Sequence, residues 1–171
     1  LDPLQLSRRA RFRRNAGAPE SRRNSLMPKH RETRRLPWSA AEMFDLVADI
    51  GRYPEFLPWV QGMRVGPVQN GVVVADMIVG FRMIRERFTS RVTLDRPRTV
   101  HVDYLDGPMK HLFNDWTFRD APDGGCEIDF AVDFEFRNKA FEKLAGLFFA
   151  QAFEKMVGAF VARAEALYGK R

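Results

Sequence analysis

Residues 127–168 read EIDFAVDFEFRNKAFEKLAGLFFAQAFEKMVGAFVARAEALY and place a strand directly before one long helix. Apolar side chains occupy every second position of the first ten residues, and four of the positions between them are acidic, so one strand face meets a core and the other meets water. The apolar positions are Ile128, Phe130, Val132, Phe134 and Phe136. With Asn138 as N-cap, the pattern predicts a helix over about 139–168, ~45 Å long at ~1.5 Å per residue.

The predicted helix carries a broad apolar stripe that needs a partner surface. The stripe consists of Phe141, Ala145, Phe148, Phe149, Ala152, Met156, Phe160, Ala164 and Leu167. Small residues recur along the helix, and we expect them to widen the space between the helix and the surface it covers. These small residues are Ala145, Gly146, Ala152, Gly158 and Ala164.

The beginning of the patterned region predicts one strand and two helical pieces. Lys29–Leu36 is typical of a strand, and Ser39 with Glu42 forms a capping box that opens a helix. We expect this helix to include Ile50 and to end at Gly51, because glycine favours helix C-termini. Residues 53–59 hold two prolines among large apolar residues, which limits them to a short helix or a turn.

Residues 60–136 predict an antiparallel meander of six strands, in which turn sequences such as Asn70-Gly71 separate apolar runs. The strand at 84–94 directs Ile84, Phe88, Val92 and Leu94 inward, with arginine and threonine on its outer face. The last strand has an acidic outer face. One basic and one acidic face favour charge pairing across strands on a solvated surface rather than a binding patch.

The predicted elements form an α+β domain in which a strongly curved sheet wraps around the long C-terminal helix, a helix-grip fold. That helix is the only predicted element long enough to cover the sheet. The space between them has two interpretations: a filled aromatic core, or an apolar cavity for a lipid-like or aromatic ligand. Strand parity directs only Glu86, Ser90 and Asn114 inward among polar residues.

Composition narrows the classes of protein to consider. The 171 residues hold 28 basic and 22 acidic side chains, a formal charge of +6. Residues 1–26 carry seven arginines and two acidic residues, a net +5, which leaves +1 for the rest and weakens the interpretation as a nucleic-acid-binding domain. The single cysteine excludes a disulfide framework. Because the longest uninterrupted apolar run has seven residues, we predict a soluble, intracellular domain without a membrane span.

We divide the chain into a disordered basic extension, residues 1–28, and one ligand-binding domain, residues 29–171. The extension has three interpretations. It resembles a mitochondrial targeting segment in being rich in arginine and poor in acids. It could be a basic arm that touches RNA or anionic lipid. It could also precede the true start of translation, at Met27.

Neither a catalytic nor a metal site is predicted. His30, His101 and His111 are scattered along the chain, show no metal-ligand spacing and are expected on the solvated surface. Cys126 follows two glycines of a hairpin turn and lacks a histidine pattern typical of an activated nucleophile. We therefore expect a protein that is not an enzyme and uses no catalytic cofactor.

Five ordered motifs resemble the coenzyme Q-binding branch of the START-like superfamily, which overlaps the ribosome association toxin family and the polyketide cyclase grouping. The resemblance covers about residues 29–168. The motifs are Tyr53-Pro-Glu-Phe-Leu-Pro-Trp59, Val79-Gly-Phe81, Arg85-Glu-Arg-Phe-Thr-Ser-Arg-Val92, Asp106-Gly-Pro108 with Trp116-Thr-Phe118, and Asp133-Phe-Glu-Phe136. The resemblance implies a START-like, Bet v 1-like helix-grip fold and a hydrophobic tunnel that binds ubiquinone or a polyisoprenoid quinone precursor. Members act as lipid chaperones in respiratory electron transport and quinone biosynthesis.

The resemblance also implies which residues contact the ligand. The tunnel mouth would be formed by Tyr53, Pro54, Phe56, Leu57, Pro58 and Trp59. The sheet side would be lined by Phe81, Phe88, Trp116, Phe134 and Phe136, and the helix side by Phe148, Ala152, Met156 and Phe160. Strand parity adds Glu86, which could contact a quinone oxygen, or could instead reach water or pair with an arginine.

Partners and location follow from the same resemblance. We expect ubiquinone or an isoprenoid quinone as ligand, transient contact with a membrane surface, and no DNA. The location would be the bacterial cytoplasm or the cytoplasmic face of the inner membrane, or the matrix side of the mitochondrial inner membrane in a eukaryote. Two alternatives remain: a ribosome-associated inhibitor of subunit joining, with Arg85, Arg87 and Arg91 contacting phosphates, and a polyketide cyclase.

Overall fold

A computed structural model describes residues 29–171, so the predictions for residues 1–28 lie outside the described part of the chain. The described chain forms seven strands, two α-helices and one 3₁₀ helix, η1. In chain order the elements are β1 (Lys29–Leu36), α1 (Ala40–Ala48), η1 (Ile50–Glu55), β2 (Val60–Val65), β3 (Val72–Phe81), β4 (Ile84–Asp95), β5 (Thr99–Asp106), β6 (Met109–Asp120), β7 (Cys126–Phe136) and α2 (Lys139–Tyr168).

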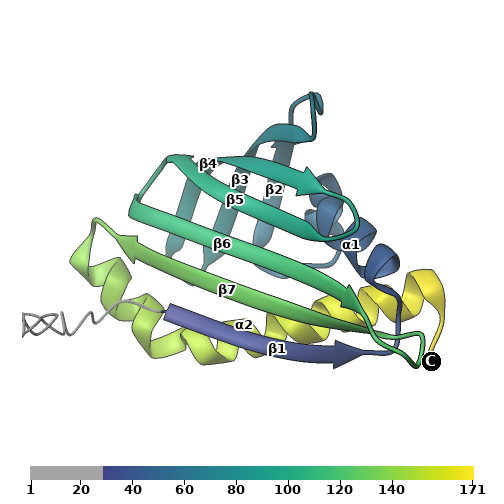
Figure 1. The fold of residues 1–171 in the computed structure, drawn as a ribbon. Helices are drawn as coiled ribbons and strands as arrows, with labels where there is room; N and C mark the ends of the chain where they lie inside the picture. Colours follow the sequence, from purple (N-terminus) through teal and green to yellow (C-terminus); the bar gives the residue numbers. More distant parts are fainter. Residues whose placement is uncertain (1–28) are drawn as a thin grey trace, which may run out of the picture.

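All seven strands belong to one antiparallel sheet with the order β1-β7-β6-β5-β4-β3-β2. The sheet curves, and α2 runs along it from the C-terminal end of β7 to α1 (Figure 1). This arrangement confirms the predicted α+β helix-grip fold. The Asn70-Gly71 turn is also confirmed, because both residues have positive φ (52° and 74°), as a tight hairpin turn requires.

The first helix begins as predicted but ends earlier. The Ser39 side chain accepts from the backbone N–H of Glu42, whose carboxylate accepts from the Ser39 N–H, so the capping box is present. The helix is capped at Asp49, and Ile50 belongs to η1 rather than to α1, which corrects the predicted end at Gly51. The Arg52 N–H bonds to the Asp49 carbonyl at 3.0 Å, so the chain tightens into a 3₁₀ turn.

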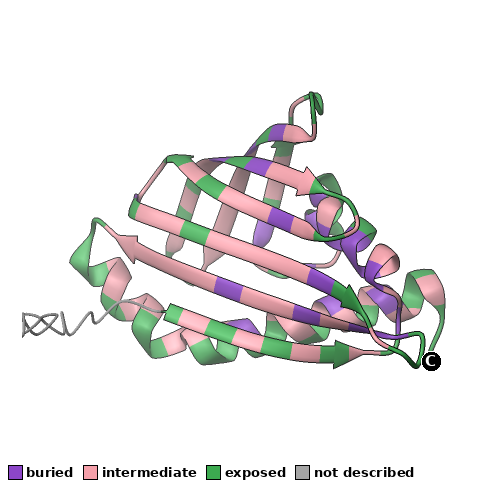
Figure 2. Ribbon diagram, in the orientation of Figure 1, coloured by how far each residue is buried: buried purple, intermediate pink, exposed green. Residues whose placement is uncertain are grey.

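The buried core lies at one end of the molecule. Figure 2 shows buried residues gathered on α1 and on the neighbouring ends of the strands, while the opposite end of the sheet and the first half of α2 are mostly intermediate or exposed. Trp38, Met43 and Val47 are at most 2% exposed and form the centre of this core. Sheet and helix are therefore packed tightly at the α1 end and less tightly at the other.

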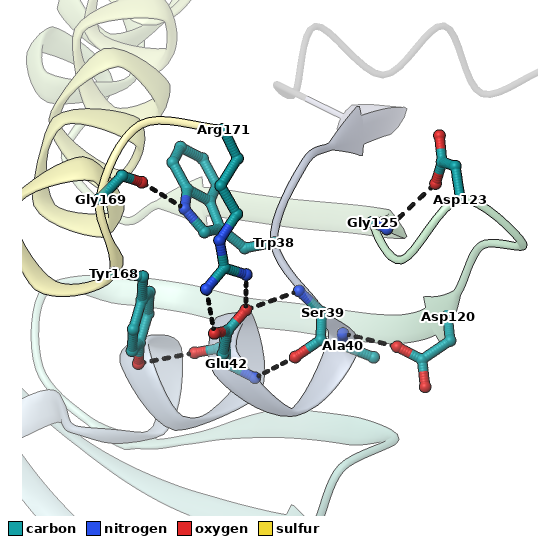
Figure 3. A network of polar contacts seen from close by, with 10 residues as sticks. All are labelled: Trp38, Ser39, Ala40, Glu42, Asp120, Asp123, Gly125, Tyr168, Gly169 and Arg171. Carbon is teal, nitrogen blue, oxygen red and sulfur yellow. Dashed lines mark hydrogen bonds and ion pairs between the residues drawn. The ribbon is translucent and has the colours of Figure 1, made fainter.

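Hydrogen bonds fasten the C-terminal end of α2 to the start of α1 (Figure 3). The Trp38 indole N–H donates to the Gly169 carbonyl at 2.9 Å, and the Tyr168 hydroxyl donates to the Glu42 carbonyl at 3.0 Å. The Arg171 guanidinium donates to both carboxylate oxygens of Glu42, at 2.7 and 2.9 Å, and lowers the pKa of that carboxyl. The helix is thus anchored at this end.

The exposure of α2 corrects parts of the predicted stripe. Phe153 was omitted from it but is buried, whereas Leu167 was included but is 51% exposed. Gly146 and Gly158 face open space, since a Cβ at either would meet no atom within 4 Å. They lie on the outer side of the helix and do not widen the space beneath it.

α2 is the one helix of residues 29–171 that is long and apolar enough to cross a membrane. An 18-residue window has a mean hydropathy of 1.4, and 11% of it is buried. The prediction of no span rested on short uninterrupted apolar runs, but the window average also includes small residues between those runs. Core helices of folded domains pass the same test, and here the helix packs along the sheet.

The charges on the outer sheet face pair with neighbouring strands. Arg87 on β4 bonds to Asp76 on β3 at 2.7 Å, and Arg119 on β6 bonds to Asp129 on β7 at 2.5 Å. The basic face of β4 and the acidic face of β7 do not pair with each other, because β5 and β6 lie between them. Charge pairing across strands is present, as predicted, within each local pair.

Candidate functional site

A cavity of about 230 Å³ lies between α2, η1 and the inner face of the sheet. Its volume far exceeds the ~10–15 Å³ that one buried water requires. Its wall consists of Ile50, Tyr53, Leu57, Trp59, Val60, Met63, Ala75, Met77, Phe88, Ser90, Val92, Val100, Val102, Leu112, Asn114, Trp116, Phe130, Val132, Met156 and Phe160. None of these side chains is a carboxylate, a lysine, an arginine or a histidine, so the site suits an uncharged, largely apolar ligand.

Fewer than half of the predicted ligand-binding residues lie on this wall. They are Tyr53, Leu57, Trp59, Phe88, Trp116, Met156 and Phe160. They come from five elements or connections: η1, the segment after it, β4, β6 and α2. The fold therefore brings together residues that are more than 100 positions apart in the chain.

The other predicted residues lie around the cavity. Pro54 and Pro58 are exposed, and Phe56 packs against Tyr53 and Phe160 with ring centroids 5.8 and 5.3 Å apart. Accordingly, only part of the 53–59 segment reaches the cavity.

The predicted residues near the β3–β4 turn form a separate group. Phe81 and Phe148 pack together at 5.8 Å, and the Arg82 guanidinium lies 4.1 Å from the centroid of Phe148. Ala152 lines a second hollow, also of about 230 Å³, with Phe81 and Arg82. This group is a junction between the turn and the first half of α2.

Three predicted residues remain. Phe134 and Phe136 pack against α2 at the C-terminal end of β7, and Glu86 lies near the β3–β4 turn. The ring of Phe134 packs against that of Phe149 with centroids 5.7 Å apart, and the rings of Phe136 and Phe141 have centroids 6.1 Å apart. Glu86 is half-buried on β4, opposite Val79 of β3, and does not line the cavity. Its inward parity is as predicted, but its position is too close to the β3–β4 turn to reach the cavity.

Most polar groups on the cavity wall have partners within the protein. The Tyr53 hydroxyl donates to the Val47 carbonyl at 2.5 Å, and burial raises the pKa of this phenol. The Trp116 indole N–H donates to the Asn114 side-chain oxygen at 2.9 Å, and the Asn114 amide donates to the Ala131 carbonyl at 3.0 Å. These bonds fix the orientation of the Asn114 amide and of the Trp116 ring.

A smaller cavity of about 50 Å³ lies next to the first, between β1 and α2. The two share Trp116, Phe130, Met156 and Phe160, so these four side chains separate neighbouring compartments. The smaller one also has a charged rim, formed by Glu32 and Arg34 of β1.

His30 differs from the prediction of a solvated surface histidine. It lies on the inner side of β1, where its ring is 4.2 Å from that of Phe153, and it bonds to Glu32 at 3.0 Å. Burial tends to raise the pKa of Glu32, but hydrogen bonds from His30 and Arg34 outweigh it and lower that pKa overall. Arg34 also reaches Glu154 of α2 at 3.1 Å, which ties β1 to the helix.

The remaining histidines and the cysteine show no catalytic arrangement. His101 and His111 lie on the outer sheet face beside Asp115 and Asp133, as predicted for surface residues. Cys126 is fully buried, and burial raises the pKa of its thiol to about 11, so it is not an activated nucleophile. Within residues 29–171, no group of three or more metal-ligating side chains is present.

Sequence reasoning missed most of the aliphatic wall. The missed residues are Met63, Ala75, Met77, Val100, Val102 and Leu112, whereas Val92 and Val132 were predicted to point inward but were not named as ligand contacts. Strand parity was the signal that could have found them, since they are the inward residues of β2 to β7. The family motifs emphasise aromatic residues and so direct attention elsewhere.

Comparison with known proteins gives consistent results. A family model described as "Polyketide cyclase / dehydrase and lipid transport" matches residues 36–161. Ribosome association toxin RatA of Escherichia coli (strain K12) is 36% identical over 146 residues, covering 85% of this chain and 92% of the toxin. Coenzyme Q-binding protein COQ10 homolog B, mitochondrial, of Xenopus laevis is 33% identical over 146 residues, covering 83% of this chain and 60% of that protein.

A solved structure supports the fold. The Zhui aromatase/cyclase from Streptomyces sp. R1128 superposes with a TM-score of 0.72 at 17% identity, covering 81% of this chain and 94% of that one. At this identity the likeness concerns the fold alone.

Proposed function

Given that the chain belongs to the family of polyketide cyclases, dehydrases and lipid transport proteins, we propose that it binds ubiquinone or a polyisoprenoid quinone precursor. In this proposal it acts as a lipid chaperone that supports respiratory electron transport and quinone biosynthesis. The observation that carries the proposal is the apolar cavity under α2. The coenzyme Q-binding relative gives the ligand class.

The chemistry of a quinone fits the cavity wall. A quinone ring and its isoprenoid tail are uncharged and apolar apart from a few oxygen atoms, and each Å² of apolar surface buried contributes roughly 25 cal/mol before ordering costs. The cavity, at about 230 Å³, is smaller than the roughly 300–1,000 Å³ of typical small-molecule sites. A long tail therefore extends beyond the cavity or displaces α2.

We expect any displacement of α2 to occur in its first half. The end of the second half is anchored by hydrogen bonds. Trp38 donates to the Gly169 carbonyl, and Tyr168 and Arg171 donate to Glu42 at the start of α1. The first half has no fully buried residue before Phe153 and exposes Leu147 to 68%. Weakly packed segments open at lower free-energy cost than the core does.

Transient contact with a membrane surface is part of the proposal. Met83, at the tip of the β3–β4 turn, is fully exposed, and Arg82 beside it reaches Phe148 of α2. An exposed apolar tip next to a cation suits the interface of an anionic bilayer. Such contact would allow the protein to exchange quinone with the bilayer. The protein would do so from the bacterial cytoplasm or the cytoplasmic face of the inner membrane, or from the matrix side in mitochondria.

A second candidate function is inhibition of ribosomal subunit joining, which the 36% identity to the ribosome association toxin favours. Binding to rRNA depends on basic side chains that contact phosphates. Arg87 is already paired with Asp76, and the net charge of residues 27–171 is +1. We therefore rank this candidate second.

A cyclase remains the third candidate, on the basis of the family description, which names polyketide cyclases. Cyclisation of a polyketide needs polar groups that donate and accept protons at the reacting carbons. On the described cavity wall, Tyr53, Trp116 and Asn114 bond to the protein itself, which leaves the Ser90 hydroxyl without a carboxylate, lysine or histidine beside it on the wall to exchange protons with. The proposal therefore includes no catalytic step.

The direct test is titration with a short-tailed ubiquinone, followed by quenching of tryptophan fluorescence, since Trp59 and Trp116 line the cavity. We expect saturable quenching with one site per chain. Phe88→Asp places a charge on the apolar wall and should abolish binding, as should Trp59→Asp. Phe113→Asp is the matched control, because Phe113 lies on the partly exposed outer side and does not line the cavity. Quenching that survives both cavity variants would contradict the proposal.

A further inference from the structure

Among residues 29–171, Ser90 is the one buried residue with a polar side chain that is not aromatic, at 7% exposure. It lies in the middle of β4, opposite Ala75 of β3 and Tyr104 of β5. Its side chain lines the cavity between Phe88 and Val92, the inward residues on either side of it. A hydroxyl therefore interrupts an otherwise apolar stretch of wall.

The Ser90 hydroxyl forms no hydrogen bond with another group of residues 29–171, in contrast to three other polar side chains on the same wall. Tyr53, Trp116 and Asn114 each have a bond within the protein. The Tyr104 hydroxyl, on the neighbouring strand, accepts from the Met109 backbone N–H at 3.0 Å. The hydroxyl is not sealed off: among residues 29–171 the enclosed side-chain atom without a partner is Glu142 Oε1, not Ser90 Oγ, so Ser90 Oγ stays accessible from the cavity that it lines. This unused bonding capacity faces the cavity.

We propose that the Ser90 hydroxyl is the hydrogen-bonding contact for the oxygen atom of the bound lipid, so that the ligand is a lipid carrying a carbonyl or a phenolic hydroxyl. This inference rests on the proposed function and names the group that reads the ligand's polar end. A serine hydroxyl can donate one hydrogen bond and accept two. It therefore suits both a quinone carbonyl and the hydroxyl of a quinol or phenolic precursor.

The position of Ser90 along β4 also assigns an orientation. Towards the end of the strand, Val92 and the α1 core close the cavity, and Val92 is 4% exposed. Towards its start, Phe88, Glu86 and Ile84 are only half-buried and lead to the β3–β4 turn. The ring of the lipid thus lies at the closed end, and its tail leaves along Phe88 towards the turn and the first half of α2.

An unused N–H of Asn114 on the same wall supports a polar ring at this depth. Asn114 uses one amide hydrogen for the Ala131 carbonyl and its oxygen for Trp116, which leaves one N–H. Asn114 lies opposite Val102 in the β5–β6 register, and Val102 lies opposite Val92 in the β4–β5 register. The strands β4 and β6, which carry Ser90 and Asn114, therefore lie on either side of β5. Both side chains lie on the inner face of the sheet, where they line the cavity.

The test compares two ligands in three forms of the chain. The ligands are a short-tailed ubiquinone and an isoprenoid hydrocarbon without oxygen atoms. We expect Ser90→Ala to weaken binding of the ubiquinone about 3- to 10-fold, as loss of one hydrogen bond predicts, and to leave binding of the hydrocarbon unchanged. Val92→Ala, two residues along the same wall, should weaken binding of the ubiquinone and binding of the hydrocarbon by the same factor.

The unliganded protein supplies a second readout. Because the Ser90 hydroxyl bonds to no other group of residues 29–171, we expect Ser90→Ala to leave the midpoint of thermal unfolding close to that of the unaltered chain. Equal ubiquinone affinity in Ser90→Ala and the unaltered chain would overturn this inference alone. Equal loss of both ligands in Ser90→Ala would overturn it too. Binding of neither ligand by the unaltered chain would overturn the proposed function and this inference with it.

Discussion

Removal of the Phe160 ring should reveal how much of the stability comes from packing between α2 and the sheet. Phe160 is 6% exposed and lies on the walls of both cavities. Its ring meets those of Tyr53, Phe56 and Trp116 at 5.6, 5.3 and 5.5 Å. It therefore joins α2 to η1 and to β6, across the region that the proposed ligand occupies.

The expected cost of Phe160→Ala follows from this environment. A buried Phe→Ala substitution typically costs about 3–5 kcal/mol. Because Phe160 already borders two cavities, it has fewer contacts to lose than a ring enclosed on all sides, so we expect about 3 kcal/mol. For a domain of this size, that corresponds to a decrease in Tm of about 6–12 °C.

Urea unfolding followed by circular dichroism measures the effect, with the m-value as a check that both states keep their compactness. Leu147→Ala is the matched control, since it truncates a side chain of the same helix that is 68% exposed. We expect the control to change stability by no more than about 0.5 kcal/mol. A cost below about 1 kcal/mol for Phe160→Ala would refute the packing of α2 described above.

Three other predictions concern pH and the anchored end of α2. Hydrogen bonding to Asp115 and Asp103 outweighs burial and raises the pKa of His101 above 6.5 in the folded state. Its stabilising contribution is therefore complete below about pH 6.5 and is lost as pH rises through the raised value; urea midpoints at pH 6 and pH 8 should differ more in the unaltered chain than in His101→Gln. Glu42→Ala removes one side of the capping box and the partner of Arg171, and should cost about 1–2 kcal/mol in urea unfolding; Glu55→Ala, which breaks only surface ion pairs, should cost less. Trp38→Phe removes the bond to Gly169 and should lower stability by about 1–2 kcal/mol while leaving quinone binding intact, because Trp38 does not line the cavity; lost binding would show that the anchored end also shapes the site.

The elements of the fold were accessible from sequence because local signals specify them. Alternation in β7, the positive-φ turn at Asn70-Gly71 and the capping box at Ser39 each depend on neighbouring residues. The end of α1 was placed too late, because Ile50 continues the apolar pattern while the chain has already tightened into η1. Periodicity does not distinguish an α-helical turn from a 3₁₀ turn.

The candidate site was only partly accessible, since strand parity specifies the face of a side chain but not its position along a curved sheet. Glu86, Phe88 and Ser90 all point inward, yet only Phe88 and Ser90 reach the cavity. Phe134 has the same parity, and the ring of Phe149 packs against it. Distinguishing a filled position from an open one requires the path of α2, which depends on contacts between distant parts of the chain.

The edge strand illustrates a further limit. His30 resembles a surface histidine in sequence because β1 stands alone at the start of the domain. Its inner side is covered only because β1 pairs with β7, about 100 residues later, and because α2 brings Phe153 against the ring. Pairing between distant strands leaves no local signal.

Whether the cavity under α2 holds a quinone can be measured on protein purified from its native host without added lipid. Organic extraction and mass spectrometry of the purified chain measure the bound lipid per mole of protein. We expect a polyprenyl quinone, or its phenolic precursor, in near-stoichiometric amount from the unaltered chain and a loss of most of it from Phe88→Asp. An extract without such a lipid, from protein that co-sediments with large ribosomal subunits, would contradict the account.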